Sequence, residues 1–257
     1  MIMNTGQDIR MREFFDETNK ALIVDYTKGL LGVEFRNIKD YIVAIDPSII
    51  EAIILSPGEA KRHNDLLCQK RVPFIIKCDW SNRSLDEHSA YPAQKFRQVP
   101  ICGATDALRL GASAVIADVH FGTSDADAAE SMQALRALVD GGNDSGLPVI
   151  ASIVPFGSRV SEENYADVAG LGMRMCLELG AIASAVPLVA SHDAAKLVEA
   201  SMKCPLVANA AIVSPMNRVD DIMTTFQAMM ESGIRAIILD GFDSRCDLNL
   251  LATMIKG

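Results

Sequence analysis

The sequence predicts an α/β fold: a single (β/α)8 barrel across residues 21–257, preceded by an N-terminal helix. First, one joint occurs three times, at 110–118, 179–185 and 232–240, where a helical stretch is followed by glycine and a short apolar run. Glycine just past a helix supplies a left-handed C-cap, and a small residue lets a buried strand begin at once. Second, the apolar runs are continuous, as parallel strands covered on both faces require. Third, 257 residues match the typical barrel of about 250.

The elements follow in the order that such a barrel needs. Residues 8–20 are expected to form the leading helix, because Ile9, Met11, Phe14 and Phe15 fall near one face. Eight strands are predicted, at 21–24, 52–55, 73–76, a run ending at 118, 147–152, a run ending near 186–187, 205–209 and 236–241. Helices are predicted at 103–110, at 126–139 and before residue 180, with a turn at 141–146 and a short closing helix. The long loop 79–100 is predicted to be a lid over the barrel.

The composition of the chain argues against several classes of function. A net charge of −9 argues against a nucleic-acid partner, which would require a basic face. No apolar run reaches the length of a membrane span, and residues 1–8 lack the features of a signal peptide. The six cysteines include no Cys-x-x-Cys pair, so they are expected to be reduced and not to bind zinc. We therefore expect a cytoplasmic protein with one domain, 1–257, and no membrane partner.

Polar residues end the predicted strands, where a β/α barrel carries its active site. A lysine, a histidine and carboxylates together suit acid–base chemistry on a carbonyl or polyhydroxy compound, although any one of them could merely cap a helix. We expect four of them to be catalytic, namely Asp25, Lys77, Asp118 and His120. The other five, Ser56, Ser152, Ser184, Asn209 and Asp240, are expected to bind substrate.

Lys77 has two possible roles. Burial would lower its pKa, and a neutral lysine can attack a ketone to form a Schiff base. Alternatively, it is an electrostatic clamp between Asp25 and Asp118. His120 should point the same way as Asp118, two residues before it, and could be a general base or a loop histidine. Asp25, Asp118, His120 and Asp240 could offer metal ligands, but their spacing is not diagnostic, so we expect no metal and no cofactor.

The order of several segments resembles the class I aldolase superfamily that contains archaeal-type fructose-bisphosphate aldolase and the deoxyribose-phosphate aldolase relatives. The similar segments are Val24–Gly29, Pro73–Lys77, Leu110–Val115 through Phe121–Thr123, Leu147–Gly157 and Glu178–Ala181. The resemblance covers most of the chain. It implies a barrel, a small-molecule substrate and a homo-oligomer.

Departures from the family pattern bear on the chemistry. The resemblance implies a Schiff-base lysine on the sixth strand, where this chain has Ala185, and a tyrosine on the fifth, where it has Ser152–Pro155. Phosphate-binding turns are implied after strands seven and eight, where Asp240 and Asp243 would repel phosphate. The sequence therefore predicts a diverged enzyme with lyase or isomerase chemistry on a non-phosphorylated compound. An inactive binding or assembly subunit and a sugar-phosphate aldolase with a relocated lysine are the alternatives.

Overall fold

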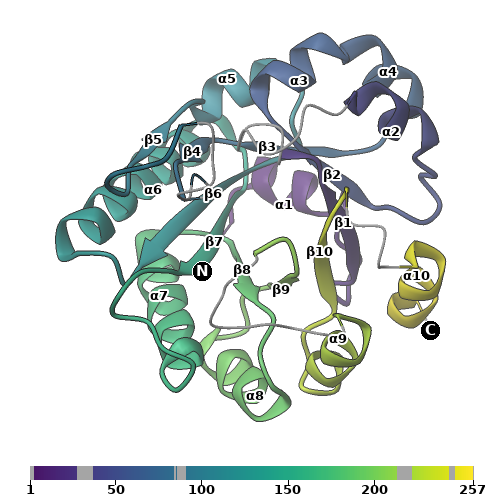
Figure 1. The fold of residues 1–257 in the computed structure, drawn as a ribbon. Coiled ribbons are helices and arrows are strands. Elements are labelled where there is room, and N and C mark those ends of the chain that lie inside the picture. Colours follow the sequence, from purple (N-terminus) through teal and green to yellow (C-terminus); the bar gives the residue numbers. More distant parts are fainter. Residues whose placement is uncertain are drawn as a thin grey trace.

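The computed structural model describes residues 3–27, 37–83, 85, 91–212, 222–242 and 247–256 (Figure 1). Eight parallel strands form a closed barrel in the order β1-β10-β9-β8-β7-β6-β3-β2, so the predicted (β/α)8 architecture is confirmed. These strands are β1 (Ala21–Asp25), β2 (Ala52–Leu55), β3 (Phe74–Lys77), β6 (Ala114–Phe121), β7 (Val149–Pro155), β8 (Ala183–Pro187), β9 (Leu206–Asn209) and β10 (Ala236–Asp240).

Helices surround the barrel, as Figure 1 shows. They are α2 (Ile38–Ala44), α3 (Pro57–Arg62), α4 (Asn64–Lys70), α5 (Ala104–Arg109), α6 (Asp125–Ser145), α7 (Tyr165–Leu179), α8 (Ser191–Ala200), α9 (Ile222–Glu231) and α10 (Leu248–Lys256). The three joint glycines, Gly111, Gly180 and Gly233, have φ values of 90°, 107° and 108°, which confirms the left-handed helix endings expected from sequence. Among the described helices, none combines the length and apolar character needed to cross a membrane.

The leading helix differs from its predicted bounds. It is α1 (Thr5–Met11), which begins earlier than expected because Asn4 and Gln7 form a capping box. It ends before Phe14 and Phe15, which pack with the side chains inside the barrel and close the end opposite the strands' carboxyl ends. The spacing of the two aromatic residues reflects this plug rather than a helix face. Figure 1 shows α1 behind the strands.

The predicted turn at 141–146 is also wrong, because α6 continues to Ser145 and only Gly146, with φ 68°, ends it. Gly142 lies inside the helix, where a Cβ atom would come within 2.7 Å of the Leu147 carbonyl oxygen. Gly142 therefore permits close packing between α6 and the chain leading into β7.

The alternation of side-chain direction along the strands determines where the site lies. Ala21, Ile23, Ile75 and Ile116 belong to the core inside the barrel, whereas their neighbours in sequence pack against the helices. On these strands the next inward position is polar, because side chains two positions apart share a face; it is Asp25 on β1, Lys77 on β3 and Asp118 on β6. The barrel thus has an apolar interior below and a charged layer at the carboxyl ends of its strands, which we call the mouth.

Glycine is required at 157, where the chain turns sharply after β7. Gly157 has φ +120°, and a Cβ atom there would come within 2.6 Å of the Gly122 carbonyl oxygen. We expect Gly157→Ala to lower the free energy of unfolding by about 2–3 kcal/mol, measured by urea denaturation. Gly58→Ala is the control, because its nearest atom would be 3.9 Å away, and it should not reduce stability. Equal midpoints for the two variants would contradict this account.

Candidate active site

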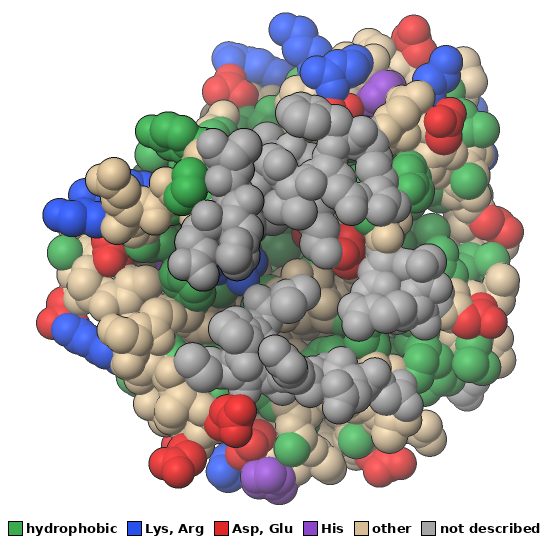
Figure 2. Space-filling view, in the orientation of Figure 1, with side chains coloured by type: hydrophobic (Ala, Val, Ile, Leu, Met, Phe, Trp, Pro, Cys, Tyr) green, Lys and Arg blue, Asp and Glu red, His purple; other side chains and the backbone are tan. Residues whose placement is uncertain are grey.

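A small pocket of about 50 Å³ lies at the mouth, and Figure 2 shows this face of the molecule. Such a volume suits the reacting end of a small molecule, since whole ligand sites span about 300–1,000 Å³. Five residues expected at strand ends line the pocket together: Asp25, Lys77, Asp118, Asn209 and Asp240. The lining also includes Thr27, Asp79, Trp80, Ser81, Arg83, Ala211 and Ile212.

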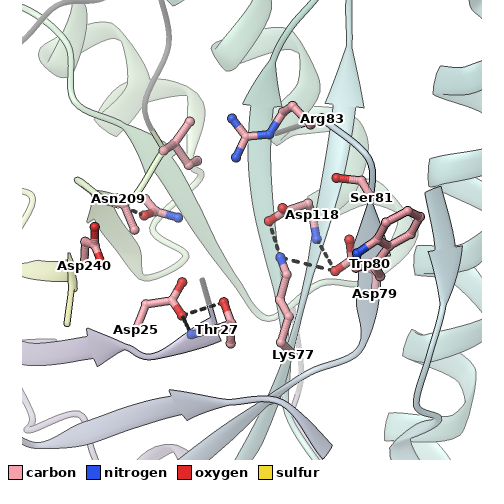
Figure 3. A pocket seen from close by; sticks show the side chains of 12 residues that line it. Asp25, Thr27, Lys77, Asp79, Trp80, Ser81, Arg83, Asp118, Asn209 and Asp240 are labelled. Atoms are coloured by element: carbon pink, nitrogen blue, oxygen red, sulfur yellow. Dashed lines mark hydrogen bonds and ion pairs between the residues drawn. The ribbon is translucent and has the colours of Figure 1, made fainter. Parts of the chain in front are cut away.

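Lys77 is held between two carboxylates (Figure 3). Its Nζ lies 3.2 Å from Asp79 Oδ1 and also forms an ion pair with Asp118, and its side chain is only 13% exposed. Burial pushes the pKa of Lys77 down, but the carboxylates of Asp118, Asp79 and Asp25 outweigh burial and raise the pKa above its usual value. The expectation of a lowered pKa is therefore wrong. Lys77 is a cation, and its closer acidic partners are Asp118 and Asp79.

The three carboxyl groups around Lys77 differ in their proton affinity. Burial opposes ionisation of Asp118, yet the Lys77 ammonium and the Arg83 guanidinium hold its pKa well below the usual range. Burial raises the pKa of Asp79 and of Asp25, and the nearby Asp118 carboxylate adds to both shifts. The pocket therefore combines one firmly ionised carboxylate with two that retain a proton more readily.

A short turn orients Asp25. Its Oδ1 accepts hydrogen bonds from Thr27 N at 2.7 Å and from Thr27 Oγ1 at 2.6 Å. Asn209 and Asp240 form equivalent turns, accepting from the backbone N–H groups of Ala211 and Phe242 at 3.0 Å. Each residue thus uses one oxygen to fix its own loop, and Figure 3 shows the three side chains across the pocket from Lys77.

Removing the Thr27 hydroxyl tests this turn. Burial raises the pKa of Asp25 and the Thr27 hydrogen bonds partly oppose that rise, so Thr27→Val should raise the pKa further. Carbon-13 NMR of the carboxyl groups measures it directly. The pKa of Asp25 is higher in the folded protein than in the unfolded chain. The free energy of unfolding therefore decreases as the pH rises from the unfolded pKa to the folded pKa. In Thr27→Val this decrease should continue to a higher pH. Thr27→Ser keeps the hydroxyl and should match the native protein. An unchanged pKa in the valine variant would contradict the account.

His120, which was expected among the strand-end residues of the active site, does not line the pocket that contains Lys77. Its ring packs on Phe96, with centroids 4.6 Å apart, and its Nδ1 lies 3.1 Å from Gln98 Oε1. Burial lowers the pKa of His120 to about 3. His120 is therefore a neutral histidine that lies beneath aromatic and amide side chains. Those side chains belong to segment 96–98, and the sequence of the strand that carries His120 gives no sign that this segment covers it.

The three serines expected to bind substrate also lie outside the pocket lining. Ser56 caps α3, since its Oγ accepts a hydrogen bond from Glu59 N at 3.1 Å. Ser184 is buried, and it alternates with Ala183 and Ala185, which belong to the interior core, so its side chain faces the helices. Ser152 does face the interior and lies 3.3 Å from Asn209 Nδ2, where it supports a lining residue.

The part of the site that sequence reasoning missed comes from the loop 79–100. Its ends form a hairpin, β4 (Asp79–Ser81) paired antiparallel with β5 (Gln98–Pro100), instead of a loop throughout. Gln98 Nε2 donates to Asp79 Oδ2 at 2.8 Å and to the Asp118 carbonyl at 2.6 Å, which ties the hairpin to β6. The sequence places Asp79 only two residues after Lys77, but its position beside Asp118 depends on the hairpin, where Asp79 Oδ1 accepts a hydrogen bond from Asp118 N at 2.9 Å.

Ala185 lies inside the barrel, fully buried, next to Ser152 on β7 and Val207 on β9. That it replaces a Schiff-base lysine stays a prediction. Within the described ranges, no three His, Cys, Asp or Glu side chains lie close enough together to hold a metal ion.

Comparison with known proteins identifies the family. The model of the DeoC/LacD family aldolases matches residues 20–211. The chain belongs to the DeoC/LacD aldolase family. The matched part of the chain reaches from β1 to just past β9, so it includes the lysine, the hairpin and most of the pocket.

Solved structures share the barrel of this DeoC/LacD family member. An archaeal fructose 1,6-bisphosphate aldolase superposes with a TM-score of 0.77 at 18% identity, covering 98% of this chain and 100% of that one. A structure of an archaeal fructose-1,6-bisphosphate aldolase with its catalytic lysine bound to a carbinolamine intermediate gives 0.75 at 19% identity, with 98% and 100% coverage. A fructose-bisphosphate aldolase from Slackia heliotrinireducens gives 0.70 at 14% identity, with 100% and 87% coverage. These likenesses establish the fold.

Proposed function

We propose that this aldolase-family protein catalyses lyase or isomerase chemistry on a small, non-phosphorylated carbonyl or polyhydroxy compound, by acid–base catalysis without a covalent lysine adduct. One observation carries the proposal: Asp79 and Asp118 hold Lys77 as a cation, opposite the carboxyl group of Asp25, which has a raised pKa. A fixed cation and a poised carboxyl group in one pocket are what proton transfer next to a carbonyl requires.

Lys77 would stabilise negative charge. An ammonium group has three N–H donors, and two are directed to Asp79 and Asp118. The third is available to a carbonyl oxygen bound in the pocket. Because the two carboxylates hold the ammonium in place, it needs no reorganisation as charge develops on that oxygen. A nucleophilic lysine, in contrast, would have to lose a proton that both partners stabilise.

Asp25 would move the proton. In a lyase reaction, it takes the proton from the hydroxyl group β to the carbonyl, the C–C bond breaks, and the electron pair forms an enolate. In an isomerase reaction, it takes the proton from the carbon α to the carbonyl and forms an enediolate. In both cases Asp25 returns the proton to carbon, and Lys77 faces the oxygen that carries the charge.

The charges of the lining favour an uncharged substrate. Four carboxyl groups, those of Asp25, Asp79, Asp118 and Asp240, face two cations, Lys77 and Arg83. This acidic balance disfavours a phosphate and suits hydroxyl groups, which donate to carboxylates. Asn209 and Asp240 are the groups that we assign to substrate hydroxyls, with Ser152 supporting Asn209.

The test is incubation of the protein in D₂O with a panel of non-phosphorylated aldehydes, ketones and sugars, each beside its phosphate ester. Proton NMR should show cleavage, isomerisation or deuterium exchange α to the carbonyl in at least one non-phosphorylated compound. Parallel borohydride treatment, followed by peptide mapping, should leave Lys77 unmodified. A borohydride adduct on Lys77 or a preference for the phosphate esters would contradict the proposal. Binding by saturation-transfer NMR without any exchange would indicate the alternative, an inactive binding subunit.

We further propose that the protein is a homo-oligomer, on the strength of the family resemblance alone. Light scattering at micromolar concentration measures the mass, and a mass of 27.7 kDa, that of one chain, would contradict this expectation.

A further inference from the structure

Two cysteines lie side by side at the base of the β4–β5 hairpin. Cys78 immediately precedes β4, and Cys102 follows the end of β5 by two residues. The backbone pairing of the hairpin continues into them, because the Cys78 carbonyl oxygen accepts from Ile101 N at 2.8 Å and from Cys102 N at 3.3 Å. Their side chains line the same cavity, and each thiol donates to a nearby backbone carbonyl, Cys78 Sγ to Ile76 at 3.6 Å and Cys102 Sγ to Gly103 at 3.5 Å. Two cysteines whose backbones are hydrogen bonded and whose side chains line one cavity meet the proximity that a disulfide requires.

Both cysteines also line a cavity that is separate from most of the site. It has a volume of about 380 Å³ and lies between the hairpin and helices α5 and α6, with Ala104, Leu135 and Leu138 on the helix side. Cys102 is partly exposed, whereas Cys78 is 2% exposed behind it. A small polar oxidant can therefore reach Cys102 first, and Cys78 is positioned to react only with what forms on Cys102.

We propose that Cys78 and Cys102 form a dithiol pair that hydrogen peroxide oxidises to an intramolecular disulfide. The Cys102 sulfur attacks a peroxide oxygen, the O–O bond breaks, and Cys102 becomes a sulfenic acid as water leaves. The Cys78 sulfur then attacks the Cys102 sulfur, the S–O bond breaks, and a second water leaves with the Cys78 proton. The two thiols together lose two electrons, and one peroxide molecule is reduced to two waters.

Exposure and the mutual influence of the two thiols assign the two roles, because Cys102 is partly exposed and Cys78 is buried. The neighbouring Cys78 thiol holds the pKa of Cys102 below its usual value, while the Cys102 thiol and burial raise the pKa of Cys78. The thiolate is the reactive form, so Cys102 is the attacking sulfur and Cys78 the resolving one. Because Cys78 lies between Lys77 and Asp79 in the chain, the disulfide would join the hairpin's second strand to the segment that carries the charged site.

The experiment treats the reduced, full-length protein with hydrogen peroxide and then alkylates free thiols after unfolding. Tryptic digestion should give peptide 78–83 linked to peptide 98–109, with a mass 2 Da below the sum of the two reduced peptides. Cys68, which is exposed and lies on α4, should be alkylated in the same sample. Pairing of Cys78 or Cys102 with other cysteines, or Cys102 ending as a sulfinic acid beside a free Cys78, would overturn the proposal.

Three variants separate the roles. Cys68→Ser should form the linked peptide as the native protein does. Cys78→Ser should leave Cys102 as a sulfenic acid, trapped by dimedone, because the resolving thiol is absent. Cys102→Ser should leave Cys78 reduced for at least tenfold longer, since Cys78 is shielded. Equal oxidation rates of Cys78 with and without Cys102 would contradict the assigned order. Circular dichroism before oxidation verifies that each variant is folded.

Discussion

Replacing Lys77 with methionine is expected to lower the free energy of unfolding by about 3–5 kcal/mol at pH 7, measured by urea denaturation. The lysine is 13% exposed and is the cation paired with both Asp79 and Asp118. Methionine fills a similar volume but leaves two buried carboxyl groups without that partner. The folded protein loses stability because the cost of desolvating their charge is no longer offset by the ammonium group.

The loss should depend on pH in a defined way. Asp118 has a lowered pKa, so its contribution is present above the unfolded pKa of about 4 and is lost as the pH falls below it. Lys77 has a raised pKa, so its contribution is complete below about pH 10 and is lost as the pH rises further. The difference between the native protein and the variant should therefore be largest between about pH 4 and pH 10.

Two controls make this result specific. In the Lys77→Met background, Asp118→Asn removes one stranded charge and should recover part of the lost stability. Lys196→Met makes the same replacement at an exposed lysine whose partner is Asp193, and it should leave the unfolding midpoint unchanged. An equal, pH-independent loss in the two methionine variants would show that the Lys77 ion pairs do not stabilise the barrel.

Replacing Asp25 with asparagine is expected to lower kcat by about 10²–10⁴-fold on any substrate that the panel identifies. Asparagine has the same shape and retains an oxygen that accepts the Thr27 hydrogen bonds, but it cannot take a proton. Deuterium exchange α to the carbonyl should disappear together with turnover. Since burial already disfavours the ionised form of Asp25, the variant should be at least as stable as the native protein, which separates lost chemistry from lost folding.

Asp240→Asn is the matched comparison on the neighbouring strand, where Asp240 pairs in register with Asp25. We assign Asp240 to substrate binding, so its replacement should raise KM while kcat stays within about threefold of the native value. Full turnover in the Asp25 variant would refute a proton-transfer role for Asp25. A large fall of kcat in the Asp240 variant would indicate that the two roles are exchanged.

The periodic features of the chain could be predicted from sequence because they depend on local chemistry. Glycine joints such as Gly111, Gly180 and Gly233 end helices through their own backbone freedom, and continuous apolar runs become buried strands in any parallel barrel. Alternation then placed Asp25, Lys77 and other strand-end residues at one mouth, since all parallel strands of a barrel end on the same side.

The sequence-based predictions are wrong where the surroundings of a residue come from distant parts of the chain. The pKa of Lys77 depends on how many carboxylates surround it, and Asp79 joins Asp118 there only because the hairpin folds back against β6. His120 has the correct strand position but is covered by Phe96 and Gln98, more than twenty residues earlier. Phe14 has helical spacing yet closes the barrel beyond the end of its helix.

The eight-stranded architecture and the strand ends that supply the charged groups therefore follow from local sequence, because backbone preference and side-chain alternation are properties of short segments. Which of those groups share a pocket, and which are charged there, depends on how the strands and the hairpin are arranged in space. Desolvation and Coulomb interactions depend on distances between strands and on the hairpin that covers them, and no local pattern encodes those distances.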